Sequence, residues 1–114
     1  MGRMSRTKGA AGERELAKVL RELLPQYAER IVRGAMMQAA DPSGAPDVTL
    51  PGCWVECKRQ ARPNIMAALR QAVKAAEGSG AVPVAITKAD RGKWLVTMEV
   101  EDFAAFYAEW ERGR

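Results

Sequence analysis

The sequence predicts an α/β domain whose central mixed β-sheet is flanked by helices, and three features of its 114 residues indicate this class. Amphipathic helical patterns begin and end the chain, short segments rich in β-branched residues lie between them, and one more helical segment separates two of these strands. A helix between two strands can carry the chain across a sheet to a parallel neighbour. The apolar fraction of 47% supplies one hydrophobic core, so a single domain is expected.

The expected order of elements is αβββαββα. Residues 1–9 are expected to form a flexible basic arm, and residues 10–114 the single domain. In chain order, the expected elements cover residues 10–24, 30–35, 47–50, 53–58, 64–77, 82–87, 93–98 and 101–111.

Periodicity and end signals define the three helices. Leu16 and Leu20 belong to one helical stripe, which Pro25 ends. Asn64 is a suitable N-cap for the second helix, and the glycines that follow residue 77 end it. The third helix presents an aromatic face, for which we expect core packing or a dimer contact rather than base stacking: Phe103, Phe106, Tyr107 and Trp110.

Turn residues separate the strands. The loop 41–46 is dense in Asp, Pro, Ser and Gly, and Pro51–Gly52 is a turn that joins strands 47–50 and 53–58 into a hairpin. Residues 82–87 are apolar and β-branched, as is typical of a buried strand.

Composition excludes several kinds of function. The chain has no histidine, which removes His-dependent catalysis and the usual zinc sites. Its two cysteines are expected to be reduced thiols, with Cys57 in the core. No segment predicts a signal peptide or a membrane span, so a cytoplasmic location without membrane contact is expected.

Charge is uneven along the chain. The net charge is +4, but residues 1–74 carry 13 basic and 7 acidic side chains, whereas residues 75–114 carry 5 and 7. A basic first two-thirds of the chain favours a polyanionic partner such as a nucleic acid.

Glu13 is unusual because it falls on the apolar side of the first helix, three residues before Leu16. Burial of a carboxylate is costly unless a cation or hydrogen bonds compensate it. A simpler interpretation is that Glu13 lies in the first turn and compensates the helix dipole.

Glu56, Lys58 and Asp47 form a second group. Strand alternation puts Glu56 and Lys58 on one face, and the hairpin brings Asp47 beside Glu56. Taken singly, the Glu–Lys pair is typical of a solvated strand face and Pro46–Asp47 of a turn. Two adjacent carboxylates repel unless a cation lies between them, and carboxylate ligands without histidine favour Mg²⁺ or Mn²⁺.

Together, a helical Glu13, Asp47, an eight-residue gap and Glu56-x-Lys58 resemble the PD-(D/E)xK nuclease superfamily. Lys8-Gly9 followed by Gly12-Glu13-Arg14-Glu15-Leu16 resembles the start of archaeal-type Holliday-junction resolvases and their phage and bacterial relatives. The resemblance implies a restriction-endonuclease-like core and a homodimer that cleaves branched or double-stranded DNA.

The resemblance also implies roles for individual residues. Glu13, Asp47 and Glu56 match metal-binding acids, Lys58 the catalytic lysine, and Arg14 and Arg33 basic residues near the cleaved phosphate. Further DNA contacts are expected from the arm and from the basic run after the second hairpin strand: Arg3, Arg6, Lys8, Arg59 and Arg62.

Two features depart from the family pattern or add to it. The loop 34–45, which touches DNA in such resolvases, is longer here and contains Met36 and Met37. Gln71 is a candidate auxiliary residue of the site, although a solvent-facing glutamine is the simpler interpretation.

The leading hypothesis is therefore a Holliday-junction resolvase that activates water with Mg²⁺ or Mn²⁺. One alternative keeps the chemistry and changes the substrate, as in a nickase or a restriction-like or repair nuclease. The other is a non-catalytic, basic DNA-binding module.

Overall fold

The computed structural model describes the backbone of residues 2–34 and 44–114 and the side chains of residues 9–34 and 44–114. Met36, Met37 and most of the loop 34–45 lie outside the described residues. The side chains of Arg3, Arg6 and Lys8 also lie outside them.

The first helix, α1, covers Gly2–Leu23 and begins well before residue 10. The expected basic arm is therefore helical in its backbone from Gly2 onward. No proline interrupts residues 2–23, so the helical hydrogen-bonding pattern continues through the glycines that suggested a break. Pro25 ends α1 as predicted, and a short 3₁₀ helix, η1, covers Pro25–Arg30.

The expected strand at residues 30–35 is wrong. Among residues 30–34, the described part of this segment, only Arg33 forms a bridge, which pairs it with Val48. The Thr49 side chain explains the difference, because its Oγ1 accepts a hydrogen bond from the Val32 amide at 2.9 Å and donates to the Arg30 carbonyl at 2.7 Å. A side chain thus satisfies groups that a longer ladder would have paired. The apolar signal was correct, since Ile31 is fully buried.

The four strands form one mixed sheet in the order β1-β2-β3-β4. They cover Val48–Leu50 (β1), Cys53–Arg59 (β2), Val82–Lys88 (β3) and Leu95–Thr97 (β4). β1 pairs with β2 and β3 with β4 in antiparallel fashion, whereas β2 and β3 are parallel. The helix α3, Ile65–Ala76, makes the crossover between these parallel strands, and the Asn64 side chain caps it by accepting from the Ala67 amide. The predicted mixed sheet and crossover are confirmed.

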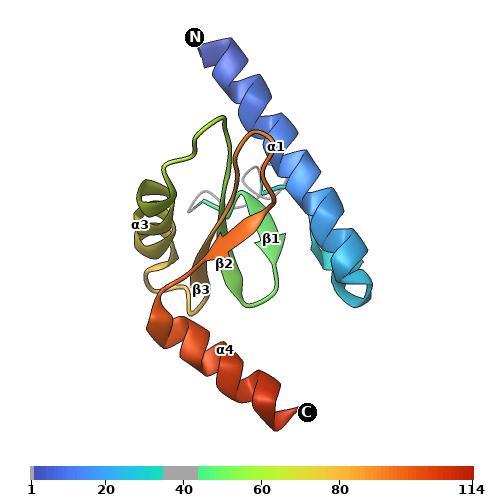
Figure 1. Ribbon diagram of the computed structural model, residues 1–114, viewed down its shortest axis with the longest axis vertical. Helices are drawn as coiled ribbons and strands as arrows, with labels where there is room; N and C mark the ends of the chain where they lie inside the picture. The colour runs from blue at the N-terminus through green and yellow to red at the C-terminus, as the bar shows by residue number, and fades with distance from the viewer. Residues whose placement is uncertain (1, 35–43) are drawn as a thin grey trace.

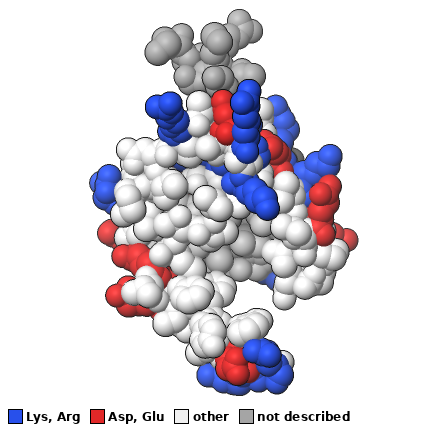
Figure 2. Space-filling model, in the orientation of Figure 1, with Lys and Arg blue, Asp and Glu red and all other residues white. Residues whose placement is uncertain are grey.

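The helix α4, Val100–Arg112, extends away from the sheet, as Figure 1 shows. It has no buried residue, and its aromatic side chains are about half exposed. Figure 2 shows it as a largely uncharged projection with charges gathered at its tip. Core packing of its aromatic face is therefore wrong: the helical period was correct, but no other element covers that face.

None of the described helices is long and apolar enough to cross a bilayer.

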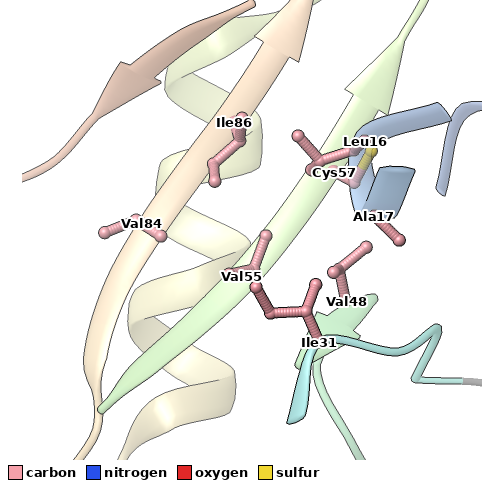
Figure 3. Packing of buried hydrophobic residues seen from close by; sticks show 8 residues of the cluster. All are labelled: Leu16, Ala17, Ile31, Val48, Val55, Cys57, Val84 and Ile86. Carbon is pink, nitrogen blue, oxygen red and sulfur yellow. The ribbon is translucent and has the colours of Figure 1, made fainter. Parts of the chain in front are cut away.

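Helices α1 and α3 cover opposite faces of the sheet (Figure 1). Val55 and Cys57 of β2 pack with Leu16 of α1 in the larger apolar cluster, which Figure 3 shows. Ala85, the β3 partner of Glu56, packs with residues of α3 in a smaller cluster. The side chains of successive residues of β2 therefore lie on opposite faces of the sheet, one face toward α1 and the other toward α3, as strand alternation requires. This restriction-endonuclease-like arrangement brings one end of β2 close to both helices.

Candidate active site

Asp47 is held directly beside β2. It precedes β1, and its amide donates to the Val55 carbonyl at 2.9 Å. Its carboxylate Oδ2 in turn accepts from the Cys57 amide at 2.8 Å. These two bonds flank Glu56 along β2, so the hairpin brings Asp47 to Glu56 as the sequence predicted.

Glu56 is buried, with only 6% of its surface exposed. Burial is the largest cause that raises the pKa of its carboxyl to about 7, and the charge of Asp47 and a hydrogen bond shared with that residue raise it further. The ammonium of Lys58, whose Nζ lies 3.8 Å from Glu56 Oε1, lowers this pKa in part. Near neutral pH, the Glu56 carboxyl can thus hold a proton or exchange it for a cation.

Glu13 approaches the same pair from α1. Burial raises the pKa of its carboxyl, and so does the nearby charge of Asp47, while Arg33 lowers it. Because α1 begins at Gly2, Glu13 lies in the middle of the helix. Dipole compensation in a first turn is therefore not its role, and the interpretation of Glu13 as an inward-facing acid is the one that fits.

A pocket of about 570 Å³ joins these residues. Its lining includes the three acids Glu13, Asp47 and Glu56, together with Lys58 and Gln71. Gln71 is exposed to solvent and also borders the pocket, so both interpretations of this residue apply. Segments from α1, the hairpin and α3 thus meet at one end of β2.

Two of the predicted DNA-binding arginines form ion pairs with acidic side chains of the same chain. Arg33 Nε lies 3.5 Å from Glu13 Oε1. Arg59 lies 3.4 Å from Glu15 Oε2 and hydrogen-bonds Asp90 Oδ1 at 2.9 Å, which links α1 and β2 to the turn after β3. A DNA contact for either residue stays a prediction that has to compete with these pairs.

Two other predicted DNA-binding residues, Arg14 and Arg62, have no ion pair among those found within the described residues. Arg14 and Arg62 are exposed, and the charge of Arg14 lowers the pKa of the adjacent Glu13. Figure 2 shows Lys and Arg side chains gathered at the end of the molecule nearest the N-terminus. This is the end of the molecule from which an approaching phosphate backbone would meet positive charge first.

Cys57 is poorly suited to act as a nucleophile, because its thiol is buried. Burial is the largest cause that raises the pKa of its thiol to about 12, and the three nearby acids add to it. Both cysteines are free, so the expectation of reduced thiols is confirmed.

Sequence reasoning missed two glycines that shape the site. A Cβ on Gly34 would lie 1.5 Å from the Pro46 carbonyl oxygen, and the Gly34 amide donates to the Asp47 carbonyl at 2.7 Å. A Cβ on Gly12 would lie 2.6 Å from Arg59 Cβ. Gly34 therefore allows the close approach that holds Pro46–Asp47, and Gly12 allows α1 to pack near β2. In the sequence, the only sign of these close approaches was a glycine within a helical or strand-like pattern.

The donor set fits a hard divalent cation. All three acids offer carboxylate oxygens, and burial is the largest cause that raises the pKa of both Glu13 and Glu56, while the neighbouring cations Arg33 and Lys58 offset only part of this rise. Within the described residues, no group of three or more acidic or cysteine side chains is close enough to form a ready-made cluster of ligands. The side chains thus have suitable ligand atoms for a metal ion, but in this structure they are not arranged as a complete coordination site.

An α/β core that brings a helical glutamate, a Pro–Asp and a Glu-x-Lys strand to one pocket defines a nuclease of the PD-(D/E)xK class. The chain belongs to the family described as "Phage putative PDDEXK endonuclease", whose family model matches residues 4–112. No curated protein and no solved structure matches the chain. Nucleases of this class generally use divalent metal ions and act on DNA.

Proposed function

We propose that this nuclease is a metal-dependent Holliday-junction resolvase that acts on branched DNA as a homodimer. The observation that carries the proposal is the meeting of Glu13, Asp47, Glu56 and Lys58 in one pocket. Family membership supports endonuclease activity. The resemblance of residues 8–16 to the start of junction resolvases supports the branched substrate, and two copies would provide one site for each cleaved strand.

Glu13, Asp47 and Glu56 would hold Mg²⁺ or Mn²⁺. Such an ion, when bound, supplies Lewis acidity for phosphodiester hydrolysis. Because burial and Asp47 raise the pKa of Glu56 to about 7, this carboxyl would have to give up its proton to hold a cation. Metal affinity is therefore expected to increase as pH rises toward 7.

Lys58 acts on the phosphate and the attacking water. Its Nζ lies 3.8 Å from Glu56 Oε1, so its ammonium is held in the same pocket as the acids. There it can orient the water or donate to a phosphate oxygen that gains negative charge. Gln71, on the α3 side of the pocket, is placed to hydrogen-bond the same water or phosphate.

The test uses a synthetic four-way junction and a linear duplex of the same sequence, each labelled on one strand at a time and incubated with Mg²⁺. We expect paired, symmetric nicks in the junction that leave 5′ phosphates, and much slower cutting of the duplex. The Asp47→Asn variant should be inactive. Glu22→Gln, which neutralises an exposed acid on α1, is the matched control and should cut normally.

The possible outcomes separate the parts of the proposal. Equal cutting of junction and duplex would contradict the junction substrate and leave the nuclease assignment intact. Normal cutting by Asp47→Asn would contradict the assigned site. Cleavage that persists in a chelator would contradict metal dependence.

A further inference from the structure

The helix α4 presents an apolar surface that no other helix or strand of the described structure covers, although the Arg114 guanidinium lies over the Trp110 ring, 4.7 Å from its centroid. We name it the aromatic stripe: Phe103, Phe106, Tyr107 and Trp110. Three of these rings form a continuous row, since ring centroids lie 6.3 Å apart for Phe103 and Tyr107 and 5.7 Å apart for Tyr107 and Trp110. The positions follow the i, i+3, i+4, i+7 spacing by which amphipathic helices anchor in grooves.

A groove of that kind lies along the outer side of α3. This α3 groove has a volume of about 340 Å³, and Met66, Leu69 and Val73 form its apolar floor. Met66 is 55% exposed. Arg70 and Lys74 of α3 line the same groove, and so do Glu77, just past the end of α3, and Glu99.

The two helices are opposite in charge and match in length. α3 carries two basic and no acidic side chains, whereas α4 carries four acidic and one basic. Their lengths of 12 and 13 residues correspond to about 18 and 20 Å. Opposite charges beside matching apolar surfaces favour one specific partner.

The α3 groove of the same copy does not receive this helix. Glu99, the N-cap of α4, lines the groove, but α4 then runs away from α3 (Figure 1). We propose that α4 of one copy lies in the α3 groove of a second copy, and that the two copies exchange these helices reciprocally. Reciprocal exchange about a two-fold axis gives a closed dimer and covers both unpartnered surfaces with one kind of contact.

This arrangement leaves the catalytic pocket open, because the α3 groove and the pocket share no lining residue. The inference rests on the proposed homodimer and specifies its contact. Its test measures mass rather than cleavage, so its failure is distinguishable from failure of the nuclease proposal.

The test is sedimentation equilibrium of the full chain at low salt. The wild type should be a dimer. A groove variant, Arg70→Glu with Lys74→Glu, and a helix variant, Asp102→Lys with Glu109→Lys, should each dimerise at least about tenfold more weakly. Asp102 lies four residues before Phe106 and Glu109 three after it, so both border the aromatic stripe. Glu101→Lys, on the opposite side of α4, is the control and should remain dimeric.

An equimolar mixture of the two variants gives the decisive result. In a mixed dimer, each helix meets a groove of opposite charge, so dimers should return. Circular dichroism of each variant checks that it is folded. A monomeric wild type, a groove variant that still dimerises, or folded variants that stay monomeric when mixed would each overturn the exchange of α4.

Discussion

Replacing Glu56 by Gln should stabilise the metal-free protein at alkaline pH, although it removes one of the proposed metal-binding acids. Glu56 is buried, and its pKa is raised from 4.5 to about 7, first by burial and then by Asp47. Below pH 4.5 the carboxyl is neutral in both the folded and the unfolded chain, and it has no effect on stability. Between pH 4.5 and 7 the unfolded chain loses this proton first, so the free energy of unfolding falls as pH rises.

The magnitude follows from the two pKa values. The difference between 4.5 and about 7 corresponds to about 3 kcal/mol, since one pH unit is worth about 1.4 kcal/mol. The wild type therefore loses about this much relative to Glu56→Gln, and the loss is complete above pH 7. Gln is nearly isosteric and can still donate a hydrogen bond to Asp47, so the variant should keep the local geometry.

The assay is urea unfolding of both proteins in a chelator at several pH values from 4.5 to 8.5. The difference between them should be near zero at pH 4.5 and reach about 3 kcal/mol in favour of Glu56→Gln at pH 8.5. Adding Mg²⁺ should stabilise the wild type and not the variant, because the ion binds only the native site. Glu22→Gln should show no such pH dependence. A constant difference between wild type and Glu56→Gln across this range would refute the reasoning.

Three further variants test other parts of the site. Lys58→Ala should slow cleavage at least about a hundredfold and change junction affinity only a few-fold, because one phosphate contact is a small part of a charge-driven affinity; comparable losses in both assays would contradict a catalytic role. Neutralising the three basic residues of segment 1–9 should lower the slope of log affinity against log salt by about two to three, and an unchanged slope would show that this segment does not touch DNA. Gly34→Ala should destabilise the protein by several kcal/mol or reduce activity sharply, because its Cβ would lie 1.5 Å from the Pro46 carbonyl oxygen; a stable variant with normal activity would show that the Pro46–Asp47 segment moves freely.

Much of the fold could be predicted because its signals are local. Asn64 supplies both the side chain and the spacing of an N-cap, and its bond to the Ala67 amide is present. Pro51–Gly52 set the hairpin register that pairs Val48 with Val55. The same register brings Asp47 beside Glu56, so this half of the candidate site followed from the sequence.

Errors arose where tertiary partners decide the outcome. The segment 30–35 has the composition of a strand, yet the Thr49 side chain takes hydrogen bonds that a strand would have made. The aromatic face of α4 has the periodicity of a core helix but remains exposed. Periodicity reveals that a face is apolar, and it does not identify what covers that face.

By itself the sequence determined the order of the long helices and of the four sheet strands, the mixed sheet and the proposed donor set of carboxylates and one lysine, because these depend on side-chain chemistry and short-range spacing; the extra strand expected at residues 30–35 was wrong. Only the tertiary structure decided that Glu13, in the middle of α1, lies beside Asp47. It also decided that Arg33 and Arg59 form ion pairs with glutamates of α1. Glu13 and Asp47 are 34 positions apart in the chain. Their proximity depends on how closely α1 packs against β2, which Gly12 permits and which no local pattern encodes.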